Sequence, residues 1–404
     1  MQNRRKFLKN SLLTLAGAGL VPKVLPGIAV DPRQEEKKKK FVYRTLGRTG
    51  IKLPIISMGI AYTSNPNLIR QALDEGVKLY ATAEFYTNGN NQIMLGEVTQ
   101  NRSRDSFMIM TTAGELHYYE QQDGMYKPDT DPDKILEHAN SSLERLKVDY
   151  VDLFLLPFTA RRESVFFEPF LKAMEKFKKD GKAKFIGIAT HTYQHEAIRA
   201  AVDVGIYDVV MTAYNFRIQN RDEIEEAIQY AADASLGIIA MKTMAGTYWD
   251  KERTKPINTK AALKWVLQNE NIHTTVPGCT TYDQLYQNLA IMEDLELTDE
   301  EKLDLKSPSE ELSSGLYCQQ CNRCIQQCPE GIDIPTIMRS YMYAYGYRDL
   351  EIAQKTLRSS RLRSVPCTNC NYCKINCKMG FDIKTKILDI SRLNNVPEEF
   401  IRRM

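Results

Sequence analysis

The sequence predicts an α/β protein in two parts, a (β/α)8 barrel of the TIM type followed by a small helical domain. Three observations predict this: a length of 404 residues, an alternation of short apolar runs with amphipathic stretches over residues 42–300, and cysteines concentrated in residues 311–404. A chain of this length is expected to form two or three domains. With 43% hydrophobic and 26% charged residues, the composition excludes a disordered, collagen-like or multi-spanning membrane chain.

Eight short apolar runs predict the strands of the barrel. They are rich in β-branched and aromatic residues, as expected for strands buried on both faces. The runs are 55–58, 77–81, 107–111, 151–156, 185–188, 209–212, 238–241 and 274–276. Helices are predicted between them at 68–75, 133–146, 165–179, 194–204, 221–232, 259–268 and 282–292. This rhythm over about 250 residues favours a barrel. A doubly wound open sheet is the rival, but no G-x-G-x-x-G motif follows the first strand.

Residues 1–30 are predicted to be an export signal. A basic start that contains Arg4 and Arg5 precedes a weakly apolar segment at 11–21, which is too short to span a bilayer that needs about 20 residues. The Arg4-Arg5 pair and the residues after it resemble a twin-arginine signal, which directs folded proteins to the periplasm. The alternative is a basic amphipathic segment that carries no targeting signal. Residues 31–41 include four consecutive lysines and are predicted to be a solvated linker.

The positive charge of the chain lies in this leader. The first 29 residues hold five basic residues and no acidic one, so removing those five charges from the formal net charge of +3 leaves −2. A slightly acidic mature protein gives no reason to expect nucleic acid as a partner. Contact with a membrane is expected only through the export pathway.

Several short motifs, in their order along the chain, resemble the aldo/keto reductase family over residues 42–295. The motifs are Leu46-Gly47-Arg48-Thr49-Gly50, Met58-Gly59, Ala81-Thr82-Ala83-Glu84-Phe85-Tyr86, Asp152-Leu153-Phe154-Leu155-Leu156, Ile186-Gly187-Ile188 and Pro277-Gly278. Members of this family are (β/α)8 barrels that reduce carbonyls with NADPH. The resemblance implies an active site at the carboxyl ends of the strands, built from an Asp, a Tyr, a Lys and a His.

Most of that catalytic set is absent from this sequence. The Asp position is Ala81, the Lys position is Thr112 and the His position is Pro157. Only Tyr86 remains, and a tyrosine without a neighbouring ammonium group is a poor proton donor at neutral pH. The family's usual carbonyl reduction is therefore not the expected activity. Met211 and Met241 also replace a glutamine and an aromatic residue that commonly contact the nicotinamide.

Other polar residues follow the predicted strands, where barrels of this kind place their sites. Together with Tyr86, we predict that His191 and Lys242 form a remodelled catalytic pocket. Candidate cofactor-binding residues are Thr190, Asn215, Gly278, Thr280, Thr281 and Asn288. The segment from Gly278 to Thr281 opens the last predicted helix and would offer backbone N–H groups to a phosphate-bearing ligand such as NADP.

Eight of the nine cysteines form two similar runs near the C-terminus. Each run has the spacing C-x2-C-x2-C-x3-C and resembles that of bacterial ferredoxins, in which the fourth cysteine binds the other cluster. The resemblance implies two [4Fe–4S] clusters, one held by Cys318, Cys321, Cys324 and Cys377, the other by Cys367, Cys370, Cys373 and Cys328. Four-cysteine zinc sites are the alternative, but zinc modules do not need this doubled run.

The spacer between the runs is predicted to be helical. Ile334, Ile337, Met338, Tyr341 and Tyr345 recur at helical spacing and are predicted to face the core, and a second stretch follows at 350–357. This length and pattern resemble the α-helical ferredoxin domains of multi-subunit reductases, which pass electrons along a chain of clusters.

Three functions remain open. The first is an exported iron–sulfur oxidoreductase that exchanges single electrons with a redox partner protein or electron carrier and acts on a small molecule in the barrel pocket. The second is a non-catalytic barrel that docks a redox partner. The third is an NADP-dependent carbonyl reductase with an unconventional site. The first is favoured because both cysteine runs are intact, whereas most of the residues that the family uses for catalysis and for contact with the nicotinamide are replaced.

Overall fold

The computed structural model describes residues 41–112, 126, 130–218, 220–306, 315–360, 362, 366–368, 370 and 373–401. The predicted export signal and all but the last residue of the predicted linker lie outside these described residues. The domain boundaries predicted from the sequence remain predictions. Among the described helices, none combines the length and apolar character that crossing a bilayer would require.

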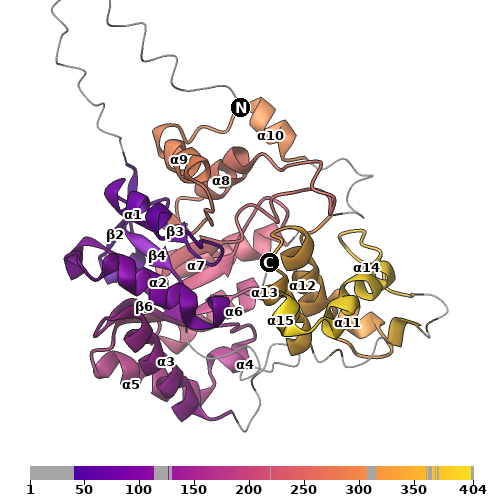
Figure 1. The fold of residues 1–404 in the computed structure, drawn as a ribbon, viewed down its shortest axis with the longest axis horizontal. Helices are drawn as coiled ribbons and strands as arrows, with labels where there is room; N and C mark the ends of the chain where they lie inside the picture. The colour runs from indigo at the N-terminus through magenta and orange to yellow at the C-terminus, as the bar shows by residue number, and fades with distance from the viewer. Residues whose placement is uncertain are drawn as a thin grey trace, which may run out of the picture. The chain divides into compact units, whose positions relative to one another are not determined.

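The central element is an eight-stranded parallel sheet whose strands follow one another in chain order (Figure 1). Its strands are β3 (Met58–Gly59), β4 (Leu79–Ala81), β5 (Met108–Thr112), β6 (Val151–Leu156), β7 (Ala183–Thr190), β8 (Val209–Ala213), β9 (Gly237–Met241) and β10 (Thr274–Thr275). Parallel bridges between Ile56 and Thr275 and between Gly59 and Gly278 join the first strand region to the last. The sheet is therefore a nearly closed barrel, as predicted.

Helices alternate with the strands and cover the outside of the barrel (Figure 1). They are α1 (Pro66–Asp74), α2 (Asn90–Thr99), α3 (Pro132–Leu146), α4 (Arg162–Val165), α5 (Glu168–Lys179), α6 (Gln194–Val204), α7 (Arg221–Asp233), α8 (Thr259–Leu267) and α9 (Tyr282–Ala290). Side-chain caps start several of them. Asn65 accepts a hydrogen bond from the backbone of Asn67 at α1, and Asp131 accepts one from Asp133 at α3.

A short hairpin closes the amino-terminal end of the barrel. Strands β1 (Tyr43–Thr45) and β2 (Lys52–Pro54) pair antiparallel, and Leu46 and Leu53 join the apolar cluster inside the barrel. Gly47, in the turn, has a φ of 47° and approaches Gly237 so closely that a Cβ atom would lie 2.5 Å from its backbone nitrogen. Only glycine allows this close contact between the hairpin and β9.

We expect Gly47→Ala to destabilise the protein by about 3 kcal/mol, because the new methyl group would force the hairpin away from β9. Gly50→Ala is the matched control. Gly50 also has a positive φ, 68°, but a Cβ atom added there would meet nothing within 4 Å. The control should cost only about 1 kcal/mol. Thermal unfolding of both variants measures the difference, and equal losses would contradict the contact.

The C-terminal part is helical, coloured orange to yellow in Figure 1. Its helices are α11 (Arg323–Gln327), α12 (Ile334–Tyr345), α13 (Leu350–Ser359), α14 (Ile383–Ile390) and α15 (Glu398–Ile401). The short helix α10 (Asp299–Asp304) precedes them and packs on α8 of the barrel, where Lys264 forms an ion pair with Glu301. Four members of the predicted apolar stripe, Ile334, Ile337, Met338 and Tyr341, are buried together, which confirms its interpretation as core.

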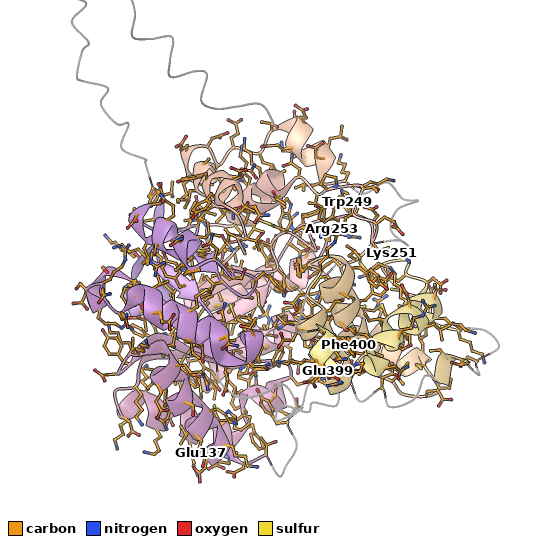
Figure 2. The ribbon with its side chains drawn as sticks, in the orientation of Figure 1. Glu137, Trp249, Lys251, Arg253, Glu399 and Phe400 are labelled. Carbon is orange, nitrogen blue, oxygen red and sulfur yellow. The ribbon has the colours of Figure 1, made fainter. Side chains whose placement is uncertain are left out.

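The barrel contributes residues to this second core through the loop after β9. Trp249 and Ile257 belong to the same apolar cluster as α12 and α14. Lys251 forms an ion pair at 3.5 Å with Asp389 of α14. Figure 2 shows Trp249 and Lys251 beside the C-terminal helices. The helical part is therefore packed directly on the carboxyl-end loops of the barrel.

Candidate functional site

A cavity of about 260 Å³ lies at the carboxyl ends of the barrel strands. We call it the mouth pocket. Its floor and walls come from the strands and their loops, and its cover comes from α12 and α13. Arg339, Tyr343 and Tyr347 are three of the residues that the helical part contributes to the lining. The helical part thus completes the pocket instead of standing apart from it.

The four positions that the family uses for catalysis all line the mouth pocket. Ala81, Thr112 and Pro157 replace three of the expected side chains, and Tyr86 is retained. Burial raises the pKa of Tyr86 well above its usual value, and Tyr343 and Asp349 raise it further. The buried Thr112 hydroxyl has no hydrogen-bond partner among the residues that the structure describes. The pocket therefore keeps the tyrosine, but without the lysine that would help Tyr86 to ionise.

His191 extends from the end of β7 into the same pocket. Its ring stacks on Phe158 with centroids 5.5 Å apart, and its buried Nδ1 atom has no hydrogen-bond partner in the described part of the chain. Burial lowers the pKa of His191 well below its usual value, and the charges of Arg339 and Lys242 lower it further. His191 is therefore a neutral imidazole at pH 7, with one ring nitrogen available to a ligand.

Lys242 follows β9 and connects the two parts of the chain. Its Nζ atom donates a hydrogen bond of 3.1 Å to Tyr343 Oη on α12. The backbone of Lys242 has a φ of 56°, a conformation that costs energy for a residue with a side chain. Asn215 Nδ2 donates to the Lys242 carbonyl oxygen at 3.1 Å and helps to hold that conformation. Because Lys242 donates to the phenol oxygen, the Tyr343 hydroxyl hydrogen remains free to point elsewhere.

The predicted cofactor-binding residues divide into two groups. Gly278 and Thr280 line the mouth pocket, together with Tyr86, His191 and Lys242. The others are not among its lining residues, and each has a local partner. Thr190 donates to the Thr192 carbonyl, Asn215 to Lys242, and Asn288 to the Cys279 sulfur, while Thr281 caps α9.

The first turn of α9 is capped by its own side chains. Thr280 N donates to Gln284 Oε1 at 2.8 Å, and Gln284 N donates to Thr281 Oγ1 at 3.3 Å. These two N–H groups are therefore engaged within the protein. The expectation that this turn offers free N–H groups to a phosphate is not met at these two positions.

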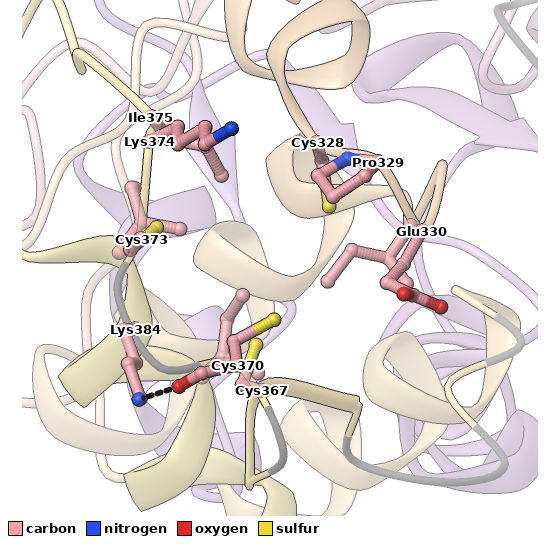
Figure 3. A pocket seen from close by; sticks show the side chains of 12 residues that line it. Cys328, Pro329, Glu330, Cys367, Cys370, Cys373, Lys374, Ile375 and Lys384 are labelled. Carbon is pink, nitrogen blue, oxygen red and sulfur yellow. Dashed lines mark hydrogen bonds between the residues drawn. The ribbon is translucent and has the colours of Figure 1, made fainter.

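The second cysteine run meets the last cysteine of the first run around a small cavity (Figure 3). Cys328, Cys367, Cys370 and Cys373 line this cavity of about 80 Å³. Isoleucine side chains, among them Ile332 and Ile383, form its apolar part. Burial raises the pKa of Cys367, as do the neighbouring thiols of Cys370, Cys328 and Cys373. The structure thus brings together the four cysteines predicted for one cluster.

The other four cysteines, Cys318, Cys321, Cys324 and Cys377, also lie together, and we call them the first cysteine group. Burial raises the pKa of Cys318, and the neighbouring Cys324, Cys377 and Cys321 raise it further. In the described residues, no three His, Cys, Asp or Glu side chains are close enough to hold a single metal ion. Each thiolate of a cubane binds a different iron atom, so its ligands stand further apart. Both groups thus have the composition and grouping expected for four-iron clusters.

One residue connects the first cysteine group to the mouth pocket. Gln320 N donates a hydrogen bond to Cys318 Sγ at 3.4 Å, and Gln320 Oε1 accepts one from Arg339 Nη1 at 3.4 Å. The Gln320 carbonyl also accepts from Thr192 Oγ1, next to His191, at 2.9 Å. The first cysteine group therefore lies against the pocket wall.

Comparisons with known proteins identify both parts. A profile of the aldo/keto reductase family matches residues 57–261, which is half of the chain. The chain belongs to the aldo/keto reductase family. A profile described as a 4Fe-4S dicluster domain matches residues 317–382, so a cluster-binding domain is fused to the aldo/keto reductase barrel. The family and the fused domain predicted from the sequence are thus confirmed.

Relatives of this aldo/keto reductase are distant. L-galactose dehydrogenase of Arabidopsis thaliana is 23% identical over 302 residues, which are 64% of this chain and 90% of that protein. The holo form of an aldo-keto reductase from Bacillus halodurans has a TM-score of 0.55 and 18% identity, and the match covers 70% of this chain and 99% of that one. An aldo-keto reductase complexed with NADPH has a TM-score of 0.50 and 18% identity, with 66% and 87% covered. At these identities the structures establish the fold alone.

Sequence reasoning missed the residues that the helical domain adds to the site of this aldo/keto reductase. Tyr343 and Arg339 lie four residues apart on one face of α12, and Tyr347 follows one turn later. This row of three residues could have been noticed in the sequence, because it repeats at helical spacing beside the predicted apolar stripe of the same helix. Tyr62, after β3, is a further missed lining residue. Nothing in the sequence indicated that this face of α12 packs on the mouth of the barrel.

The neutral state of His191 leads to a prediction on pH. Since its folded pKa lies below the unfolded value of about 6.5, its contribution to stability is complete above pH 6.5 and is lost as the pH falls below it. We expect the wild type to lose up to about 1.4 kcal/mol per pH unit in that range, a loss that His191→Gln avoids. Unfolding measured at pH 7.5 and 5.5 checks this. Equal pH dependence in both proteins would show that His191 ionises freely.

Proposed function

We propose that this chain is an exported iron–sulfur oxidoreductase, in which one-electron transfer through two [4Fe–4S] clusters is coupled to a reaction in the mouth pocket. The observation that carries the proposal is the contact of Gln320 with both Cys318 and Arg339, since Arg339 lines the pocket. The helices that cover the pocket belong to the cluster domain. The cluster that exchanges electrons and the site that binds the substrate would therefore lie side by side in one folded unit.

In this proposal the two cysteine groups hold the clusters as the sequence indicated. Cys318, Cys321, Cys324 and Cys377 would bind the cluster beside the pocket, and Cys328, Cys367, Cys370 and Cys373 would bind the other. Bound clusters supply one-electron transfer at a potential that charge, hydrogen bonds and burial determine. Cys373 is exposed. We expect a redox partner protein or electron carrier to dock on that side.

The pocket residues would handle protons and position the substrate. Tyr343 has a hydroxyl hydrogen free to donate because Lys242 already occupies its oxygen. His191 is neutral and presents a buried ring nitrogen. Helix α12 lines the pocket beside these groups, and their burial strengthens the polar interactions that they make. Reduction or oxidation of a small molecule needs proton transfer of this kind at the reacting atoms.

Carbonyl reduction with NADP is the competing function. Against it stand the missing lysine, histidine and aspartate, and the engaged N–H groups at the start of α9. These observations favour a small-molecule substrate without a bound nucleotide.

Anaerobic purification with iron, sulfide and nucleotide counted on the same sample tests the proposal. Two clusters predict about eight iron and eight sulfide atoms per chain, and no nucleotide released on denaturation. Zinc in place of iron, or one NADP per chain, would overturn it.

Export through the twin-arginine route, and thus a periplasmic location, is part of the proposal. It rests on Arg4, Arg5 and the apolar segment after them. We expect an Arg4→Lys, Arg5→Lys double variant to remain in the cytoplasm as a precursor with its clusters bound. Fractionation of cells with antibody detection measures this, and unchanged export of the double variant would contradict the assignment.

A further inference from the structure

The mouth pocket is positively charged. Lys242, Arg253 and Arg339 line it, and among its described lining residues there is no aspartate or glutamate. Lys242 donates to a phenol, Arg253 to the Tyr248 hydroxyl, and Arg339 to Gln320 and Thr336. None of the three forms an ion pair with a described carboxylate. All three are partly buried, and an excess of positive charge in a concave site raises the local concentration of anions, so this arrangement favours an anionic ligand.

Two of these cations lie near His191. Arg339 and Lys242 both affect His191 electrostatically, and Arg339 packs over the Phe158 ring, on which His191 also stacks, at 5.7 Å. His191 adds a buried Nδ1 atom that no described residue hydrogen-bonds. Two cations and a neutral hydrogen-bonding group around one spot fit a carboxylate, which accepts several hydrogen bonds at once.

The rest of the pocket is apolar. Phe85, Phe158, Met211, Met241 and Tyr347 are among its lining residues. Methionine and aromatic side chains pack well against a flat or hydrocarbon body and contribute little to a strongly hydrated one. With a volume of about 260 Å³, the cavity fits a small organic molecule.

We propose that the mouth pocket binds a small organic acid, with its carboxylate between Arg339 and Lys242 and its apolar body against the methionine and aromatic wall. The proposal deepens the proposed function by naming the substrate class, and it rests on that function in taking this pocket as the substrate site. Arg339 belongs to the cluster domain and Lys242 to the barrel. The acid is therefore held only where the two domains meet, next to the first cysteine group.

The test is calorimetric titration of the oxidised, full-length protein with clusters bound, at pH 7.5. The probes are benzoate, cinnamate and benzoylformate, each paired with its neutral amide. At least one acid is expected to bind tenfold more tightly than its amide, a difference of about 1.4 kcal/mol. Arg339→Gln and Lys242→Gln should each remove this preference. Arg392→Gln, on a residue that is 82% exposed, is the control and should bind as the wild type does.

Three results would overturn the proposal. The first is that none of the three acids binds more tightly than its amide. The second is that Arg339→Gln and Lys242→Gln both keep the preference for the acid over its amide. The third is that NADP or inorganic phosphate displaces the acid at comparable concentration. Visible absorbance of the clusters confirms that each variant is folded, and measuring two variants guards against the failure of one. Because no electron donor is present, the titration is independent of electron transfer, so this proposal and the proposed function can fail separately.

Discussion

A Cys328→Ser variant is expected to lose the cluster of the second cysteine run and to keep the cluster of the first. Although Cys328 belongs to the first run, the structure places it around the cavity of Cys367, Cys370 and Cys373. Serine is a much poorer ligand for iron than a thiolate. Iron per chain should therefore fall to about half, measured after anaerobic purification.

Spectra of the cluster that remains in each variant show which cysteines bind which cluster. Cys328→Ser and Cys370→Ser should leave the same electron paramagnetic resonance signal after reduction, and Cys377→Ser and Cys321→Ser should both leave the other one. Cys279→Ser is the control, because Cys279 is buried beside Asn288 and belongs to neither group. A Cys328→Ser signal that matched that of Cys321→Ser would contradict the exchange of fourth ligands.

Removal of iron is expected to unfold the segment that carries the second cysteine run while the barrel stays folded. Between residues 366 and 377, the described regular structure is a single 3-10 turn, Pro366–Thr368. The described part of this segment has little regular structure, so we expect ligation to supply most of its stability, as in other small metal domains. The barrel has its own large apolar core and does not depend on iron.

Hydrogen exchange of the full chain before and after chelation measures this effect. Protection in residues 366–377 should fall by at least about 100-fold, since the ligand bonds that prevent local opening are lost. Strand β6, Val151–Leu156, is buried throughout and serves as the internal control. Unchanged protection in 366–377 would show that the apolar core of the helical part holds the segment without iron.

The barrel could be predicted in detail because its strands and helices carry strong local patterns. Strand β6 and helix α6 have the predicted bounds, 151–156 and 194–204. Helix α2, Asn90–Thr99, was missed, because polar Asn91 and Gln92 are buried on it and hydrogen-bonded to the barrel, so no apolar stripe marks it. The hairpin β1–β2 was missed because its strands include Arg44 and the exposed Lys52 and therefore form no continuous apolar run.

The candidate site could be predicted only in part. Motif positions place Tyr86, His191 and Lys242 at the carboxyl ends of strands, and the structure brings them to one pocket. Thr190 ends β7 and Asn288 lies on α9, yet the side chain of Thr190 bonds to the Thr192 carbonyl and that of Asn288 to the Cys279 sulfur instead of entering the pocket. The contact between α12 and the barrel mouth joins residues that are a hundred positions apart, and no local pattern encodes such a contact.

The central claim is that the first cysteine group is electronically coupled to the mouth pocket. Potentiometric titration of the wild type and Arg339→Gln, followed by electron paramagnetic resonance, tests it most directly. Arg339 reaches Cys318 through Gln320, so loss of its positive charge should make the first cluster harder to reduce and leave the second unchanged. We predict two reversible one-electron reductions, with a lower potential for the first cluster alone in the variant. Absence of reversible reduction, or identical potentials in both proteins, would contradict the claim.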